Sequence, residues 1–137
     1  MIIIEYNHII IGGKKVELVQ FLKAIADENR LRILHLLNQE ELCVCEIETI
    51  LGMGQSNVSR HLNKLFSVSL IQREKKSQWV YYRVDRETIR KYPFLNNIFN
   101  GQSNQINPFK KDQKKYIEHK KNGMSCEQLK KLSKAID

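Results

Sequence analysis

The chain has 137 residues, about the length of one domain with a tail. Lysine and arginine total 23 against 15 aspartate and glutamate residues, which gives a formal net charge of +8. A polyanionic partner such as nucleic acid is therefore expected. No apolar run approaches the roughly 20 residues that span a bilayer. The apolar start at 1–11 lacks the basic residues and cleavage site of a secretion signal, so we expect a soluble, cytoplasmic protein with no membrane partner.

Two of the three cysteines, Cys43 and Cys45, lie two positions apart. The odd, low count is unlike a disulfide scaffold, and an unexported chain normally keeps its thiols reduced. Thiolates are soft donors that select thiophilic ions such as Zn(II), Cd(II), Pb(II) or As(III), and two on one short segment can hold a single ion. The spacing alone equally fits two buried structural cysteines, because free cysteine often packs as a small hydrophobe.

The first half of the chain predicts three helices. A glycine pair at 12–13 marks a break, after which apolar residues recur at helical spacing over 14–26. Asp27 is suited to cap a second, strongly apolar helix over 28–38, which we expect at the centre of the core. A short third helix ends at a glycine-containing link, 52–54. A helix, a glycine-containing turn and another helix are typical of the helix-turn-helix motif.

The next segments carry the predicted DNA contacts. A helix over 55–66 has hydroxyl and amide side chains near its start and basic ones behind them, which suits the major groove, although an ordinary solvated face is the alternative. Alternating residues over 72–84 predict a hairpin that turns near Lys76 and Ser77, with a basic tip suited to phosphates. The predicted DNA-contacting residues are Gln55, Ser56, Asn57, Ser59, Arg60, His61, Asn63, Lys64, Lys75 and Lys76.

The last part of the chain predicts another helix and a tail. Asp85 is expected to cap a helix over 86–99 that kinks or restarts at Pro93, and its apolar face indicates a partner chain. Polar composition over 101–115 predicts a linker, and a capping-box pattern at 125–128 begins a short, lysine-rich helix. The expected divisions are an arm over 1–13, a domain over 14–100, and a linker with a basic tail over 101–137.

Four segments in this order, 26–34, 41–46, 55–62 and 79–83, resemble the arsenic-repressor (ArsR/SmtB) family of winged-helix transcriptional repressors, from about residue 16 to 99. The resemblance implies a mainly α fold with a small β-hairpin, a winged helix-turn-helix, in a homodimer paired through the first and last domain helices. It also implies binding to operator DNA, expected to be an imperfect palindrome, and release when a toxic metal or metalloid binds. The side chains expected at the dimer interface are Leu18, Leu22, Ile89, Leu95 and Ile98.

The resemblance also implies a ligand set. Family members with the motif Glu-Leu-Cys-Val-Cys use both thiolates, here Cys43 and Cys45. Arsenite-sensing relatives often have a third cysteine where this chain has Glu48, a hard donor poorly suited to As(III). Cys126 either completes the site or is a spare cysteine. The cadmium and lead subtype is disfavoured because no cysteine precedes residue 43, and Asp85 lacks the histidine of the family's separate zinc site. Arsenite or antimonite is the favoured effector, with Cd(II), Pb(II) and Zn(II) as alternatives, and no cofactor is required.

The function that follows is a repressor that leaves its operator when a thiophilic ion binds Cys43 and Cys45. A thiol-redox repressor using the same cysteines and a winged-helix adaptor that binds protein are the alternatives. An enzyme with a small-molecule substrate is not expected, because the sequence has no Ser-His-Asp set, phosphate loop or paired acids. The four histidines, including His119 in the tail, look isolated, which predicts structural or DNA-contact roles. Nearby carboxylates are expected to raise the pKa of the thiols.

Overall fold

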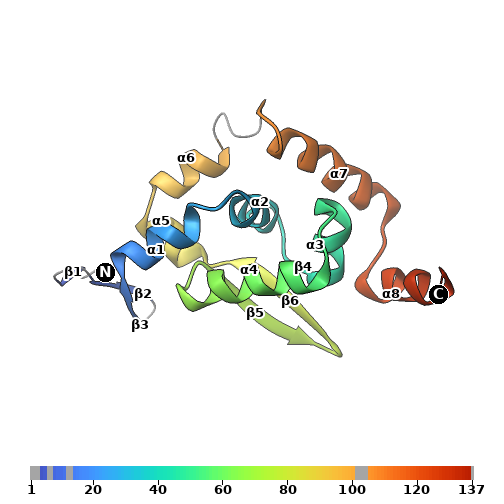
Figure 1. Cartoon of the computed structure of the whole chain (residues 1–137), viewed down its shortest axis with the longest axis horizontal. Helices are drawn as coiled ribbons and strands as arrows, with labels where there is room; N and C mark the ends of the chain where they lie inside the picture. Colours follow the sequence, from blue (N-terminus) through green and yellow to red (C-terminus); the bar gives the residue numbers. More distant parts are fainter. Residues whose placement is uncertain (1–3, 6–7, 12–13, 101–104, 137) are drawn as a thin grey trace.

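A computed structural model describes residues 4–5, 8–11, 14–100 and 105–136. The helices are α1 (Leu18–Ile25), α2 (Glu28–Leu37), α3 (Val44–Leu51), α4 (Gln55–Ser67), α5 (Arg86–Lys91), α6 (Phe94–Asn100), α7 (Phe109–Asn122) and α8 (Cys126–Ile136). The strands are β1 (Ile4–Glu5), β2 (His8–Ile11), β3 (Lys14–Glu17), β4 (Leu42–Cys43), β5 (Ile71–Lys76) and β6 (Trp79–Val84). They form two antiparallel sheets, β1-β2-β3 and β4-β6-β5. Figure 1 shows α2 between α1, α5 and α6 on one side and α3, α7 and α8 on the other. No helix in these described ranges is long and apolar enough to cross a membrane.

The helix α2 lies at the centre of the core, as predicted, because all of residues 33–37 are buried. Asp27 caps it: its carboxylate accepts a hydrogen bond from the backbone N–H of Arg30 at 3.0 Å. Burial acts to raise the pKa of Asp27, but this hydrogen bond and the Arg30 charge outweigh it, so the pKa is lowered. The helix α3 ends at Gly52, whose φ of 67° is a conformation that glycine adopts without steric cost. The predicted helix-turn-helix is confirmed as α3 and α4.

The predicted hairpin is confirmed as β5 and β6, the wing of the fold. Lys76 pairs with Trp79 across a turn in which Ser77 has a φ of 59°. The strand β6 also pairs with the short strand β4, where Cys43 stands opposite Tyr81. Cys43 therefore belongs to the sheet of the wing and directly precedes α3.

The predicted helix over 86–99 is divided at Pro93, as expected for a restart. Asp85 caps α5 by accepting a hydrogen bond from the backbone N–H of Thr88 at 3.1 Å. At the other end of the domain, the predicted start of the first helix at residue 14 is wrong. Residues 14–17 pair with β2 as strand β3, so that α1 begins only at Leu18. Strand pairing with the isoleucine-rich segment of β2 overrides the helical spacing.

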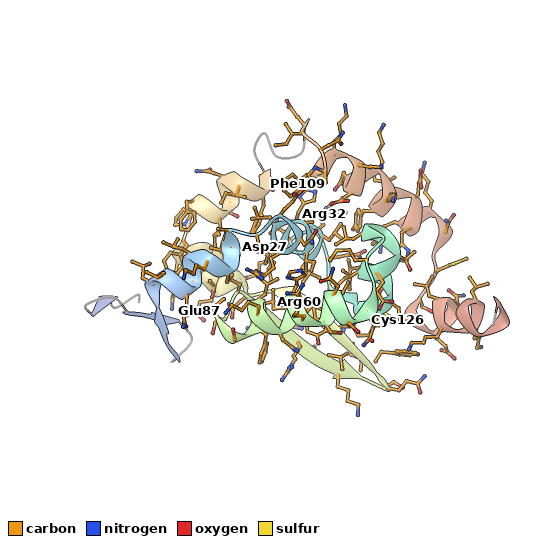
Figure 2. The ribbon with its side chains drawn as sticks, in the orientation of Figure 1. Asp27, Arg32, Arg60, Glu87, Phe109 and Cys126 are labelled. Carbon is orange, nitrogen blue, oxygen red and sulfur yellow. A yellow bond between two sulfur atoms is a disulfide. The ribbon has the colours of Figure 1, made fainter. Side chains whose placement is uncertain are left out.

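The predicted linker over 101–115 is wrong from residue 109, where α7 begins. Phe109, its first residue, packs edge-on against the ring of the buried His35, with ring centroids 5.9 Å apart (Phe109 is labelled in Figure 2). The short C-terminal helix is confirmed as α8. The predicted break at 12–13 and the first four residues of the linker lie outside the described residues. The division into arm, domain and tail stays a prediction.

The helix α7 is attached to α2 and α3 by polar contacts. Arg32 donates to both carboxylate oxygens of Asp112, at 2.9 and 3.0 Å, and also to the backbone carbonyl of Leu51 at 3.2 Å. The hydrogen bond that Arg32 donates to Asp112 is the main reason that the pKa of Arg32 is raised. Gln39 and Gln113 exchange two further hydrogen bonds, at 2.7 and 2.9 Å. The tail is thus docked on the domain by a charged pair whose side chains are only 17% and 3% exposed.

Asp112→Ala is expected to loosen α7 and α8, because it leaves the largely buried guanidinium of Arg32 without its carboxylate. Breaking one partner of such a pair costs about 3 kcal/mol in free energy of unfolding. Urea denaturation measures this loss, and limited proteolysis measures the exposure of the tail.

The matched control is Lys120→Ala, which removes the ion pair with Glu40 from the same helix. Because the Lys120 side chain is 50% exposed, we expect a loss of less than about 1 kcal/mol. Equal stability and equal cleavage of Asp112→Ala and wild type contradict this account of how the tail is held.

Candidate metal centre and nucleic-acid interface

The structure joins Cys43 and Cys126 by a disulfide between β4 and the start of α8, with Cα atoms 6.5 Å apart. Both side chains are buried, at 2% and 1% exposed. Cys45, the other predicted ligand, is a free and half-buried thiol. The tail cysteine, whose role the sequence left open, therefore meets the first cysteine of the motif within one chain (Cys126 is labelled in Figure 2).

Glu46 lies over the start of α3, next to these sulfurs. Cys43 is the N-terminal cap residue of the helix, and its backbone N–H donates to Oε1 of Glu46 at 3.2 Å. The other carboxylate oxygen, Oε2, lies 3.0 Å from Nε2 of His119 on α7. The Glu46 and His119 side chains are 13% and 7% exposed. The prediction that His119 is isolated is wrong, because docking of α7 carries it onto Glu46.

Three possible ligand atoms meet at this point. The sulfurs of Cys43 and Cys126 and a carboxylate oxygen of Glu46 all lie within 4.8 Å of one another. Donors bound about 2.0 to 2.3 Å from one tetrahedral ion lie roughly 3.3 to 3.8 Å apart, so the two sulfurs can bind one ion together only after the disulfide is reduced and they move apart. Within the part of the chain that the structure describes, Cys45 is not in this group.

A cavity of about 520 Å³ lies beside the cysteines, between α3, β6 and α8. Its lining includes Cys45, Glu48, Trp79 and Lys130. Burial raises the pKa of the Cys45 thiol, the charge of Lys130 acts to lower it, and Glu48 acts to raise it. The pKa rise expected for the thiols is confirmed for Cys45, although burial contributes more than the carboxylates. Burial also raises the pKa of Glu48, whose Oε1 has no hydrogen-bond partner among the described residues.

The same cavity reaches the predicted DNA-reading helix, because Gln55, the first residue of α4, lines it as well. The polar face of α4 is open to solvent, and Arg60 on this face, labelled in Figure 2, donates to Oδ1 of Asn57 at 2.7 Å. The predicted contact residues of α4 that are exposed or half-buried are Gln55, Ser56, Asn57, Ser59, Arg60, Asn63 and Lys64.

His61 is the exception among the predicted DNA contacts, and that prediction is wrong. Its side chain is only 3% exposed, with Nδ1 lying 3.3 Å from the guanidinium of Arg30. Burial lowers the pKa of His61. The helical phase explains the error, because position 61 shares the buried face of α4 with Val58 and Leu65. On the wing, Lys75 and Lys76 are exposed as expected, and Lys76 pairs with Glu41.

The predicted dimer interface is wrong for two of its five residues. Ile89 and Leu95 are 3% and 0% exposed and belong to the core of their own chain, since α5 and α6 each turn one face inward. Leu18 and Ile98 are partly buried against the same core. The exposed large apolar side chains on α1 and α6 are Val19, Leu22 and Phe94. Of these three, only Leu22 was among the predicted interface residues, because apolar spacing alone does not tell an inward face from an outward one.

Sequence relatives support this architecture. The family described as "Bacterial regulatory protein, arsR family" matches residues 27–72. The arsenic resistance transcriptional regulator ArsR1 of Pseudomonas putida is 42% identical over 66 residues, 47% of this chain and 52% of the relative. The cadmium resistance transcriptional regulatory protein CadC of Listeria innocua is 41% identical over 63 residues, 45% of this chain and 53% of the relative. The chain thus spans about half the length of these two relatives.

A third relative and a solved structure extend the match. The arsenical resistance operon repressor of Bacillus subtilis is 39% identical over 71 residues, which are 51% of this chain and 68% of that repressor. A homodimeric winged helix-turn-helix DNA-binding domain from Mycobacterium bovis, described as a possible ArsR-family transcriptional regulator, has a TM-score of 0.55 at 27% identity. The superposition covers 66% of this chain and 84% of that domain. With two thirds of the Bacillus repressor matched and the winged helix architecture shared, the chain belongs to the ArsR family.

Proposed function

We propose that this protein is a metal- or metalloid-responsive transcriptional repressor that binds operator DNA as a homodimer and leaves it when a thiophilic ion binds its cysteines. One observation carries the proposal. Cys43, Cys45 and Cys126 line the same cavity as Gln55, the first residue of α4. An ion bound by these thiols therefore acts next to the N-terminus of the helix that reads DNA. The chemistry is ligand binding and release, with no reaction catalysed.

The DNA-binding part of the proposal rests on surface charge and shape. The chain carries a net charge of +8, and the exposed face of α4 offers amide, hydroxyl and guanidinium groups to base edges. A two-fold dimer presents two such helices to half-sites about 34 Å apart, so the operator is an imperfect palindrome. The exposed Val19, Leu22 and Phe94 provide apolar surface for the second subunit.

Arsenite or antimonite is the effector we favour. As(III) prefers soft thiolate ligands, and Cys126 supplies a third sulfur to the cavity in which Glu48 offers only an oxygen. We expect Cys43 and Cys45 to bind the ion with Cys126, once the disulfide is reduced. Relatives described as arsenic and cadmium regulators support an effector of this class.

The short path from α3 to α4 supports the proposed coupling. The helix α3 spans only Val44–Leu51, and Gly52 and Gly54 flank the link to α4. An ion that draws Cys45 toward Cys126 tilts the start of α3 and so displaces α4 from its place in the groove. Allosteric coupling between two sites is typically about 1 to 3 kcal/mol, which corresponds to an affinity change of about 5- to 150-fold.

A thiol-redox repressor is the second candidate, and the Cys43–Cys126 disulfide specifically favours it. In this mechanism, hydrogen peroxide oxidises the two thiols to the disulfide and is itself reduced to two molecules of water. The pairing differs from the sequence prediction, in which Cys43 and Cys45 were the redox pair. Oxidation then fixes α8 to α3 without any ion.

Reduced protein bound to an operator selected from a random DNA pool is expected to release it as arsenite is added. We expect wild type to lose about 5- to 150-fold in operator affinity. Cys43→Ser and Cys45→Ser are expected to stay bound, because each removes one thiolate ligand. Fluorescence anisotropy of labelled DNA, titrated in parallel with arsenite, antimonite, Cd(II), Pb(II) and peroxide, measures the release.

Thr49→Ala is the matched control, since Thr49 lines the cavity but offers no soft donor. If both serine variants still release DNA with arsenite, the assignment of these cysteines as sensors is wrong. Release by peroxide alone, reversed by a dithiol, favours the redox mechanism instead.

Arg60→Ala is expected to weaken operator binding by about 1 to 3 kcal/mol, because it removes an exposed guanidinium from the groove-facing side of α4. The dimer, measured by sedimentation, should remain intact. Lys110→Ala removes the same charge from α7, which lies across α2 from α4 in Figure 1, and should leave the affinity unchanged.

Equal operator affinity of Arg60→Ala and wild type removes α4 from the recognition role. Wild-type protein that shows no salt-dependent DNA binding at all favours the protein-binding adaptor instead.

A further inference from the structure

The sulfurs of Cys43 and Cys126 are grouped with an oxygen donor as well as with each other. An oxygen of Glu46 lies within 4.8 Å of both sulfurs, whereas Cys45 is outside this group within the described ranges. Two sulfurs with one carboxylate differ from the three-thiolate set proposed for As(III). Zinc and related divalent cations readily combine thiolate with carboxylate ligands, and three protein ligands leave one position for water.

Glu46 is also held in place as a metal ligand is. Its Oε1 accepts a hydrogen bond from the backbone N–H of Cys43 at 3.2 Å, and its Oε2 lies 3.0 Å from Nε2 of His119. Outer-shell partners of this kind fix the orientation of a ligating carboxylate. With the Glu46 side chain only 13% exposed, these two partners hold a carboxylate oxygen within 4.8 Å of both sulfurs.

We propose that Cys43, Cys126 and Glu46 form a binding site for a divalent thiophilic cation, Cd(II) or Zn(II), with His119 as a positioning residue. The site shares two sulfurs with the arsenite set, so the two kinds of ion compete, but only arsenite needs Cys45. This inference deepens the proposed function and rests on it for the biological meaning of binding. Binding of the cation itself does not depend on DNA.

Docking of the tail assembles this site. Cys126 and His119 both come from the tail, whereas Cys43 and Glu46 belong to the domain. The ion pair between Arg32 on α2 and Asp112 on α7 holds α7 against α2. Asp112 precedes His119 in the same helix. The cation therefore joins two parts of the chain that already pack together.

A cation can bind at this site only after the Cys43–Cys126 disulfide is reduced to two thiols. A phosphine reductant and water convert the Cys43–Cys126 disulfide into two thiols, and the phosphine leaves as its oxide. The divalent cation then displaces both thiol protons, which pass to solvent. The carboxylate of Glu46 completes the set, and His119 keeps its hydrogen bond to the second oxygen.

The test is a titration of reduced, full-length protein with Cd(II) against a chromophoric chelator. Cys126→Ser and Glu46→Gln are expected to weaken Cd(II) binding by about tenfold or more, and His119→Ala by about 10- to 100-fold. Glutamine keeps a carbonyl oxygen for the backbone N–H of Cys43, so α3 retains its cap. Cys45→Ser and Glu48→Gln are expected to bind Cd(II) as wild type does. Glu48→Gln is the matched control, since it makes the same change two residues away on α3.

The arsenite response should show the reverse pattern, lost in Cys45→Ser and retained in Glu46→Gln. X-ray absorption at the cadmium edge of wild type should count two sulfur ligands. Three sulfurs, or unchanged Cd(II) binding by a folded Glu46→Gln, overturns the inference, as does equal weakening by Cys45→Ser and Cys126→Ser. If the glutamine variant does not fold, the sulfur count on wild type decides. Failure of arsenite to release DNA counts against the proposed function alone.

Discussion

The contact between Arg32 and Asp112 is the one on which the rest of the candidate site depends. Arg32 sits on α2, holds the carbonyl that ends α3, and binds both oxygens of a carboxylate on α7. One guanidinium therefore fixes three helices relative to one another. With α7 in place, His119 reaches Glu46, and Cys126 reaches a cysteine 83 residues earlier in the chain. Without that contact, His119 and Cys126 of the tail would not be held beside Glu46 and Cys43.

The positions of the cysteines matter as much as their chemistry. Cys43 lies where a strand of the wing sheet becomes the helix before α4, and Cys45 lines a cavity that α4 also lines. Under the proposed function and the inferred cation site, oxidation, a metalloid and a divalent cation would each change the bonding of Cys43 with Cys126. The three therefore act through the same contact between domain and tail, and they differ in which further donor is recruited: none, Cys45 or Glu46.

The central domain could be predicted from the sequence because its signals are local. Asp27 and Asp85 as caps, Gly52 as a helix end and the alternation of the wing each fix structure within a few residues. The sequence did not fix which face of each helix is buried. His61 and Leu95 were therefore assigned to exposed faces, although both side chains are buried. The helix α7 ends at a local signal of the same kind, Gly123 with a φ of 63°, but it is mostly charged and its docking depends on tertiary contacts such as that of Asp112. The meeting of Cys43 with Cys126 is equally a property of the fold.

The pairing of β4 with β6 places Cys43 opposite Tyr81, on the strand that runs from the tip of the wing. Cys43 is at the same time the cap of α3, which leads into α4. Under the proposed function, a single residue is thus mechanically shared by the element that reads bases and the element that follows phosphates. A displacement there disturbs sequence discrimination and nonspecific electrostatic attraction together, so that a regulator built this way leaves the duplex altogether and does not linger in a sliding, nonspecific mode.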